Sequence, residues 1–310
     1  FVAVPGDVHD GRQFIEQAVA NGAAAVVAEV PVAGFVDALP VPLLELPELR
    51  SEMGVLAARF YRHPSRDLYM VGVTGTNGKT TTSRLVAQLA RSLGKSSGVI
   101  GTLGATLDDS VASAANTTPD SISLQQQLAQ WRDQKVRCVC MEVSSHALIQ
   151  GRVSGVEFDT AIYTNLSHDH LDYHGSMDAY GRAKLLLFTT AGLRHAVVNL
   201  DDQFAPQVLA VIGEGVQVVS YSTRDTRADV YVENAHFSTA GVEGELHTPW
   251  GRGRFASPLP GDFNLANLAA AVAAVVLSGE DLPAVLAAVS RLQPVPGRMQ
   301  LIPNLCGLQV

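Results

Sequence analysis

Hydrophobic and polar positions follow two alternating patterns from residue 68 onward. Short apolar runs rich in β-branched residues alternate with longer stretches in which apolar residues recur every three or four positions, which predicts strands separated by helices. We predict strands at residues 69–74, 97–100, 136–141, 160–166, 196–199 and 216–220. We predict helices at residues 80–93, 122–133, 177–188, 264–277 and 282–292. Continuously apolar strands alternating with helices indicate an α/β fold, with a mostly parallel sheet flanked by helices on both faces.

Two regions depart from this pattern. Residues 229–235, 241–248 and 251–256 alternate apolar with polar positions and turn on glycine, which predicts a small antiparallel ribbon. Residues 1–66 have their own strand and helix patterns, with strands near 1–4 and 24–28 and helices near 13–21 and 47–61, so we expect a smaller α/β domain there. We place the domain boundaries near residues 66–67 and 296–297, where proline-containing segments interrupt the pattern.

Composition narrows the class of protein. The chain has 310 residues, of which 47% are hydrophobic and 17% charged, so it can bury a large core. Its net charge of -8 argues against a nucleic-acid or anionic-membrane partner. Cys138, Cys140 and Cys306 are too few for a disulfide framework or a four-cysteine zinc site, and Cys138 and Cys140 fall in an apolar run that predicts burial. Without a signal sequence or a membrane-spanning run, we expect a cytoplasmic protein with no membrane insertion.

A glycine-rich loop is the strongest local signal. Residues 73–82 read VTGTNGKTTT, directly after a predicted strand and before a predicted helix. Glycines let backbone N–H groups turn toward an anion, and the helix N-terminus adds partial positive charge. Lys79 can then reach the β- and γ-phosphates of a nucleotide, and Thr80 can bind Mg²⁺. The spacing is a variant of the usual phosphate loop, because Val73 stands where the strict pattern has glycine. The alternative is a glycine turn that only begins a helix.

Acidic and imidazole side chains follow two further predicted strands. Glu142 ends the strand at 136–141, and residues 165–174 read NLSHDHLDYH. The carboxyl ends of parallel strands meet at one edge of a sheet, where ligands bind. Since no cysteine or H-E-x-x-H motif accompanies these residues, the set favours Mg²⁺ over zinc. Taken singly, Glu142 would be a solvated loop residue, the histidine-rich segment a polar surface loop and Lys184 a helix-surface lysine.

Together these segments resemble the Mur ligases over nearly the whole chain. The resemblance rests on residues 74–82, on NTTP at 116–119, on MEVSSHAL at 141–148 and on TNL through DHLDYHG at 164–175. It continues with Gly261, Phe263, Asn264, Asn267 and PGRM at 296–299. Residues 1–12 resemble the domain of that family that binds UDP. On this resemblance we expect a fragment in which residues 297–310 begin a third, amino-acid-binding domain that is otherwise absent.

The resemblance implies roles for individual residues. Catalysis is assigned to Lys79, Glu142, His170 and Lys184, and Mg²⁺ to Thr80, Glu142, His170 and Lys184, with Lys184 carbamylated by CO₂. The residues implied to bind ATP are Gly75, Thr76, Asn77, Gly78, Lys79, Thr80, Thr81, Asn264 and Asn267. The residues implied to bind UDP-MurNAc-L-Ala-D-Glu are Asn116, Thr117, Thr118, Ser144, Gln150 and Arg152.

The implied activity is ATP-dependent amide ligation through an acyl phosphate. A third amino acid joins UDP-MurNAc-L-Ala-D-Glu in peptidoglycan biosynthesis; we expect meso-diaminopimelate, with L-lysine as the alternative, and we expect a monomer. Folylpolyglutamate synthase has a similar loop, but the Thr80–Thr81 pair and EVSSH at 142–146 favour a Mur ligase. The amidating Mur-like enzymes carry a four-cysteine zinc ribbon that three scattered cysteines cannot form. A further alternative is that the chain, taken as a fragment, is a non-catalytic nucleotide-binding module.

Overall fold

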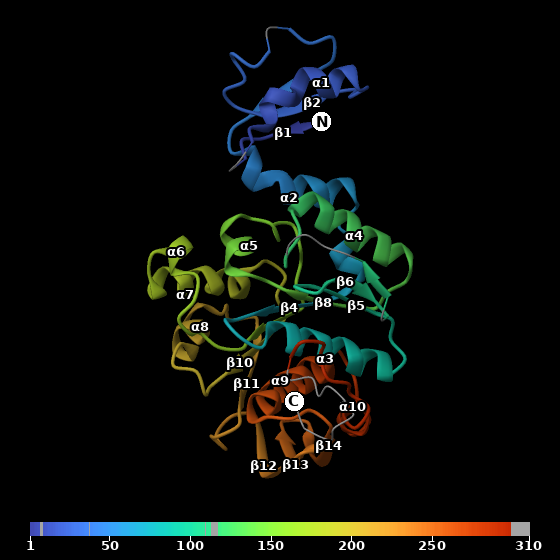
Figure 1. Ribbon diagram of the computed structural model, residues 1–310, viewed down its shortest axis with the longest axis vertical. Coiled ribbons are helices and arrows are strands. Elements are labelled where there is room, and N and C mark those ends of the chain that lie inside the picture. Colours follow the sequence, from blue (N-terminus) through green and yellow to red (C-terminus); the bar gives the residue numbers. More distant parts are fainter. Residues whose placement is uncertain (7–8, 37, 109, 113–116, 299–310) are drawn as a thin grey trace, which may run out of the picture.

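The computed structural model describes residues 1–6, 9–36, 38–108, 110–112 and 117–298. Within these residues there are two sheets, a small one of three strands near the N-terminus and a large one of eleven. Figure 1 shows the small sheet at one end of an elongated molecule, joined to the larger body through helix α2 (Leu49–Phe60). The α/β architecture predicted from the hydrophobic pattern is confirmed.

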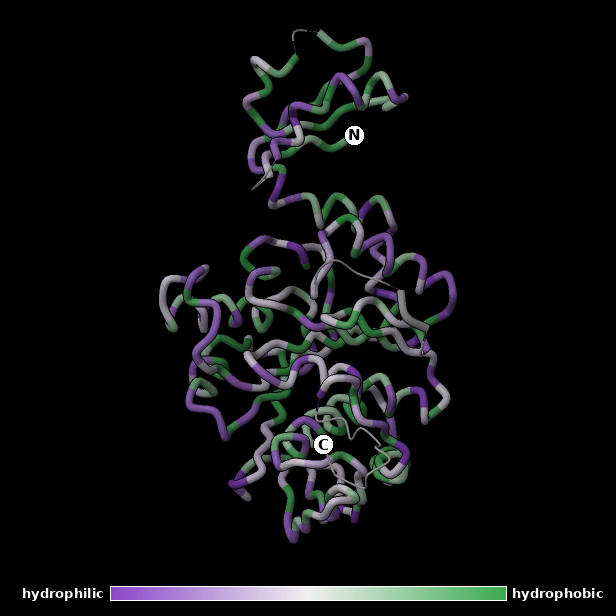
Figure 2. The backbone as a smooth tube through the Cα atoms, viewed as in Figure 1, coloured by the Kyte–Doolittle hydropathy of each residue, from purple (hydrophilic) through white to green (hydrophobic). Residues whose placement is uncertain are grey.

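Parallel strands form the centre of the large sheet. Their order is β5-β8-β4-β9-β10-β11-β12, and every neighbouring pair is parallel. Their bounds are Ser97–Gly101 for β5, Cys138–Glu142 for β8, Tyr69–Thr74 for β4, Thr160–Tyr163 for β9, His195–Asn199 for β10, Gln217–Ser222 for β11 and Val230–Ser238 for β12. The four strands β5, β8, β4 and β9 are buried along almost their whole length. Figure 2 shows many hydrophobic residues in the middle of the larger body, where Figure 1 places these strands. Because these strands are parallel, their carboxyl ends meet at one edge of the sheet.

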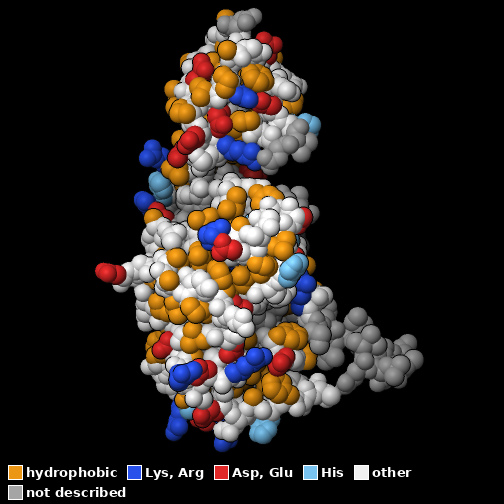
Figure 3. Space-filling model, turned by 90° about the vertical axis from the view of Figure 1, so that its left-hand side faces the viewer, with side chains coloured by type: hydrophobic (Ala, Val, Ile, Leu, Met, Phe, Trp, Pro, Cys, Tyr) orange, Lys and Arg blue, Asp and Glu red, His pale blue; other side chains and the backbone are white. Residues whose placement is uncertain are grey.

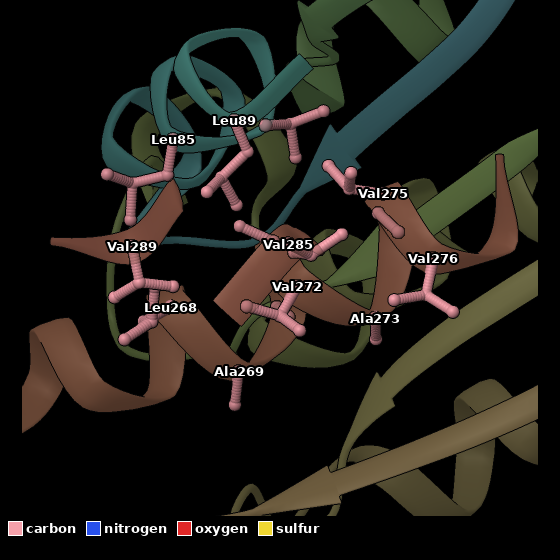
Figure 4. Packing of buried hydrophobic residues seen from close by; sticks show 14 of the residues in the cluster. Leu85, Leu89, Leu268, Ala269, Val272, Ala273, Val275, Val276, Val285 and Val289 are labelled. Atoms are coloured by element: carbon pink, nitrogen blue, oxygen red, sulfur yellow. The ribbon is translucent and has the colours of Figure 1, made fainter. Parts of the chain in front are cut away.

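Helices cover both faces of this sheet. Alternate residues of β4 point to opposite faces: Val71 and Val73 face one core, and Met70 faces the other. The first core is closed by α3 (Lys79–Ser92), α9 (Asp262–Leu277) and α10 (Leu282–Val289), whose aliphatic side chains interlock in Figure 4. The second core includes side chains of α4 (Ser121–Asp133) and α8 (Ala205–Val211). The short helices α5 (Ser145–Ile149), α6 (Leu171–His174) and α7 (Met177–Leu185) follow β8 and β9.

Both edges of the large sheet are antiparallel. Strands β13 (Gly241–Thr248) and β14 (Gly251–Ser257) form the predicted ribbon with β12. The ribbon is not separate, because β12 also pairs with β11 and extends the sheet. At the other edge, β6 (Gly104–Leu107) and β7 (Ser110–Ala112) were not predicted. They are short and rich in small residues, so they carry little hydrophobic pattern.

The N-terminal part is a small parallel sheet. Strands β1 (Val2–Ala3), β2 (Val26–Glu29) and β3 (Leu43–Leu46) pair in that order, and β3 was not predicted. Helix α1 (Ile15–Ala20) contributes the fully buried Ile15 to its core. Three 3-10 helices complete the described elements: η1 (Gly11–Phe14), η2 (Pro64–Asp67) and η3 (Leu186–Thr189).

A glycine lets α2 touch the large body. A Cβ placed on Gly54 would lie 2.2 Å from the carbonyl oxygen of Ser154. This oxygen belongs to the backbone, so it cannot move away without a large energetic cost. Helix propensity alone would make Gly54→Ala stabilising by about 1 kcal/mol, but overpacking against a rigid neighbour costs about 1–3 kcal/mol. We therefore expect net destabilisation and a lower melting temperature. Gly213→Ala is the matched control, because no atom lies within 4 Å of its Cβ position. Equal or higher stability of Gly54→Ala in thermal melts would contradict this packing.

Candidate functional site

The glycine-rich loop joins β4 to α3, as predicted. Gly75 has φ of 148° and Gly78 has φ of 84°, both in a region that favours glycine. Space imposes the same choice: a Cβ on Gly75 would lie 1.9 Å from Thr164 Oγ1, and one on Gly78 would lie 2.5 Å from Asn267 Oδ1. The loop therefore turns tightly into the N-terminus of α3, where unpaired N–H groups can bind an anion.

Residues that follow β9 hold the loop in place. Asn165 accepts a hydrogen bond from the Asn77 amide at 2.9 Å through its side chain, and from the Thr76 amide at 2.8 Å through its carbonyl. Thr164 Oγ1 donates to the Asn77 carbonyl at 2.6 Å. The Ser167 amide donates to Thr76 Oγ1 at 2.9 Å. The loop is thus ordered by four contacts from the neighbouring strand end, and a ligand would not have to order it on binding.

Lys79 points back over the loop. Its Nζ donates to the carbonyls of Gly75 at 2.8 Å and Thr76 at 2.9 Å. Burial lowers the pKa of Lys79, while the negative charges of Glu142 and Asp169 act to raise it. The amine is therefore held at the mouth of the loop, where burial disfavours its charged form more than the two carboxylates favour it.

Glu142 lies beside the loop and is only 1% exposed. Its Oε2 accepts hydrogen bonds from Thr80 Oγ1 at 2.9 Å and Thr102 Oγ1 at 3.1 Å, and its Oε1 accepts one from the Thr102 amide at 2.9 Å. Gly101 makes room, since a Cβ there would lie 2.0 Å from Oε1. The interpretation of Glu142 as a solvated loop residue is wrong. A buried carboxylate next to a threonine hydroxyl is an oxygen donor pair of the kind that Mg²⁺ prefers.

Lys184 is also buried, with 1% exposure, so its interpretation as a helix-surface lysine is wrong. Its Nζ lies 4.0 Å from the centre of the Tyr180 ring. Burial, together with the positive charge of Lys79, lowers the pKa of Lys184 to about 6. The side chain is consequently neutral at pH 7, which makes its nitrogen a nucleophile.

His170 lies in a cluster of rings near Lys184. Its ring centre is 6.0 Å from that of Tyr180 and 5.0 Å from that of His146, and it ends the loop after β9 with φ of 51°. Burial and neighbouring histidines lower the pKa of His146. Within the described residues, no three His, Cys, Asp or Glu side chains converge as a metal cluster. Of the predicted metal residues, Thr80 and Glu142 are in direct contact, whereas His170 and Lys184 each lie near the ring of Tyr180.

Four of the residues implied to bind the sugar-peptide converge at the end of β8. Thr118 Oγ1 donates to the Glu142 carbonyl at 2.8 Å, and Arg152 donates to the Thr118 carbonyl at 3.0 Å. Ser144 caps α5 by accepting from the Ala147 amide, and its own amide lies 3.5 Å from Thr118 Oγ1. The hydroxyl of Thr102 donates to the hydroxyl of Thr117 at 3.4 Å.

The other two lie apart from this group. Gln150 ends α5 and donates to the Tyr173 hydroxyl at 3.3 Å. Asn116, like residues 7–8 of the UDP-binding segment, is outside the described residues.

Two cavities open at the loop. One of about 370 Å³ is lined by residues 76–81, Glu142, Asn267 and Arg298. The other, of about 680 Å³, continues past Asn267 toward Phe263 and Asp201. Asn267 lines both cavities, accepts from Thr82 at 3.2 Å and donates to the buried Asn264 at 3.4 Å, so Asn264 supports Asn267 from behind.

Sequence reasoning missed three of these residues. Thr102 holds Glu142, Arg298 lines the smaller cavity and Asn165 holds the loop. Thr102 carries no signal of its own, because a single threonine after a strand is common. Arg298 and Asn165 lie inside segments quoted for the resemblance, so their position in those segments was the available signal.

Comparison with known proteins places this site in a family. The sequence signature described as Mur ligase middle domain matches residues 73–275, which include the glycine loop, Glu142, His170 and Lys184. The chain belongs to the Mur ligase family. Over 300 residues it is 47% identical to the UDP-N-acetylmuramoyl-L-alanyl-D-glutamate–2,6-diaminopimelate ligase of Pseudomonas aeruginosa, covering 97% of this chain and 61% of that protein. The chain thus spans less than two thirds of the length of this Mur ligase.

Solved structures agree with this assignment. A structure of a UDP-N-acetylmuramoyl-L-alanyl-D-glutamate–2,6-diaminopimelate ligase superposes with a TM-score of 0.88 at 36% identity, over 98% of this chain and 62% of the other. Mycobacterium tuberculosis folylpolyglutamate synthase complexed with ADP shares the fold, with a TM-score of 0.67 at 20% identity over 81% of this chain and 63% of its own. Among the described residues, no helix of this Mur ligase family member is long and apolar enough to cross a bilayer.

Proposed function

We propose that this chain is part of an ATP-dependent ligase that adds the third amino acid, meso-diaminopimelate, to UDP-MurNAc-L-Ala-D-Glu. The observation that carries the proposal is the placement of Lys79, Thr80 and Glu142 around one cavity at the mouth of the glycine loop. That cavity combines anion-binding amides, a lysine and a buried carboxylate, which are the groups that phosphoryl transfer requires. The names of the similar proteins supply the substrate.

The loop residues Gly75, Thr76, Asn77, Gly78, Lys79, Thr80 and Thr81 would hold the triphosphate of ATP. Their preformed turn lets backbone N–H groups meet the phosphates at little entropic cost. Asn267 would face the adenine, since it lines both the loop cavity and the larger one, and Asn264 would lie behind it through their hydrogen bond. The structure of folylpolyglutamate synthase with ADP shows that a protein of this fold accommodates an adenine nucleotide.

Thr80 and Glu142 fit a magnesium ion, because a hydroxyl and a buried carboxylate lie 2.9 Å apart beside the phosphate loop. When bound, Mg²⁺ neutralises charge that develops on the phosphoryl oxygens. His170 and Lys184 would contribute to a second position. There, reaction of neutral Lys184 with CO₂ gives an anionic carbamate and releases a proton, which converts a buried amine into an oxygen donor.

The proposed reaction has two balanced steps. An oxygen of the γ-carboxylate of the D-glutamate attacks the γ-phosphorus of ATP. A C–O–P bond forms, the bond from the γ-phosphorus to the β-phosphate oxygen breaks, and ADP leaves behind an acyl phosphate. The amine of the incoming amino acid then attacks that carbonyl carbon, forms the amide, loses a proton and expels phosphate. Lys79 would stabilise charge on the phosphoryl oxygens in the first step. Thr118, Ser144 and Arg152 would orient the acid, since they converge beside Glu142.

We further propose the arrangement around this core. Residues 1–66 would form a domain that binds the nucleotide-sugar, residues 67–296 the ATP-binding domain, and 297–310 the start of a domain that binds the amino acid. Asn116, Thr117 and Gln150 would complete the contacts to the sugar-peptide. The reaction would take place in the cytoplasm, by a monomer, as a step of peptidoglycan synthesis that supports cell-wall growth and division.

A ligation assay tests this function. The protein that carries this chain is incubated with ATP, Mg²⁺ and UDP-MurNAc-L-Ala-D-Glu, with either meso-diaminopimelate or L-lysine. We expect phosphate release and tripeptide product with diaminopimelate. Product with L-lysine alone would correct the amino acid and leave the reaction class in place. The proposal would be overturned if neither amine gave phosphate release and neither gave a product by mass spectrometry.

A further inference from the structure

A third cavity lies where the N-terminal part meets the large body. It measures about 560 Å³ and has two walls. One wall comes from the N-terminal side and carries Glu29 at the end of β2 and Glu48 at the start of α2. The other comes from the large body and carries Gln150, Ser154 and Tyr173. Figure 3 shows the face that carries α6, with a constriction between the two parts of the molecule.

Tyr173 is the only aromatic side chain among the described residues that line this cavity. Its side chain is 44% exposed, although it belongs to a cluster of rings. The His146 ring packs beside it, with centroids 4.1 Å apart, and the His174 ring meets it edge-on at 4.9 Å. Gln150 holds the hydroxyl at 3.3 Å. The ring is therefore fixed by its neighbours and offers its remaining surface to the cavity.

The lining chemistry around Tyr173 suits a sugar. A pyranose ring has C–H bonds on its faces, which pack on an aromatic ring, and hydroxyls on its rim, which need hydrogen-bond partners. Gln150, Ser154 and the carboxylates of Glu29 and Glu48 supply such partners along the walls. Arg50 lines the cavity together with the two carboxylates, so its surface is not uniformly negative. A flat aromatic surface bordered by hydrogen-bonding groups thus suits a sugar ring.

The cavity also leads toward the loop site. Gln150 ends α5, and the N-terminal cap of the same five-residue helix is Ser144. Ser144 lies against Thr118, and Thr118 binds the backbone of Glu142. A ligand whose sugar lies on Tyr173 can therefore extend along α5 and present an acid beside Glu142.

We propose that Tyr173 is the stacking platform for the sugar ring of the nucleotide-sugar substrate. The inference rests on the proposed function, because it takes UDP-MurNAc-L-Ala-D-Glu as the ligand, and it adds a residue that determines affinity for the sugar. Stacking requires the ring and not the hydroxyl, so tyrosine and phenylalanine should be nearly equivalent, whereas alanine should not.

Calorimetric titration of UDP-MurNAc-L-Ala-D-Glu into the chain tests the proposal. Tyr173→Ala should weaken binding about 10-fold, the order expected for one aromatic contact, and Tyr173→Phe should change it less than about 2-fold. UDP, which keeps its ribose but lacks the N-acetylmuramoyl pyranose ring, should bind all variants equally. Phe60→Ala is the matched control, because Phe60 is 78% exposed and lines none of the cavities described above. ATP binding, measured in parallel, reports whether each variant is folded.

The possible outcomes are distinguishable. Equal sugar-peptide affinity of Tyr173→Ala and wild type would overturn the platform and leave the proposed function intact. Equal losses for the sugar-peptide and for UDP would also overturn it, because the defect would not depend on the sugar. Failure of the wild-type chain to bind the sugar-peptide while it binds ATP would overturn the nucleotide-sugar assignment itself.

Discussion

Lys79→Ala is expected to reduce ATP turnover by about 10²–10³-fold, the order observed when a preorganised donor to a transition-state oxyanion is removed. Lys79 Nζ lies on the carbonyls of Gly75 and Thr76 and lines the cavity with Glu142. No other lysine lines that cavity among the described residues. Phosphate release in the presence of UDP-MurNAc-L-Ala-D-Glu and diaminopimelate measures the effect.

The control for this loss is Lys135→Ala. Lys135 is an exposed lysine at the end of α4, so its removal changes the net charge equally and leaves the cavity intact. Lys79→Ala should keep its melting temperature, because burial already disfavours the charged amine at this position. Turnover by Lys79→Ala at the rate of the Lys135→Ala variant would remove the phosphate-loop assignment.

Lys184→Ala is expected to abolish ligation, with a loss of about 10³-fold, and added bicarbonate should not restore it. The physical reason is the neutral state of the buried amine at pH 7, which allows it to add CO₂ and become a metal ligand. Incubation with ¹³C-labelled bicarbonate should give a carbamate carbon signal in the NMR spectrum of the wild type and none in the variant. Normal ligation by Lys184→Ala would rule out the carbamate.

Stability measurements separate this loss from unfolding. The pKa of Lys184 is about 6 in the folded state and ordinarily 10.5, so between these values the unfolded chain binds one more proton. In CO₂-free buffer, the free energy of unfolding of the wild type should therefore rise with pH from about 6 to 10.5. Below pH 6 the full cost of burying a charged Lys184 is present. Lys184→Met should lack this slope and be the more stable protein at pH 7. A slope equal to that of the wild type would contradict the burial of the amine.

The sheet and the loop could be predicted because their signals are local. Residues 69–74 are apolar and the glycines follow directly, so the β4–loop–α3 unit is visible in one short segment. The burial of Glu142 could not be predicted, because it depends on a contact with a residue far along the chain. Thr102, which holds Glu142, is 40 positions away. The burial of Lys184 could not be predicted either, because the pattern of its own helix does not decide it. Tyr180, which lies under Lys184, belongs to a helix whose pattern also suits an exposed lysine.

The loop site is assembled from distant parts of one sheet. Asn267 lies 185 positions after Thr82, and Asn165 lies 88 after Asn77, yet each pair is in hydrogen-bonding contact. Such separated contacts close late in folding, because their loop entropy must be overcome first. Nucleotide binding therefore requires strands β4 and β9 and helix α9 to be assembled together. A nucleotide that binds only this assembled state shifts the folding equilibrium toward it, so that cellular ATP would act as a stabiliser of newly made chains.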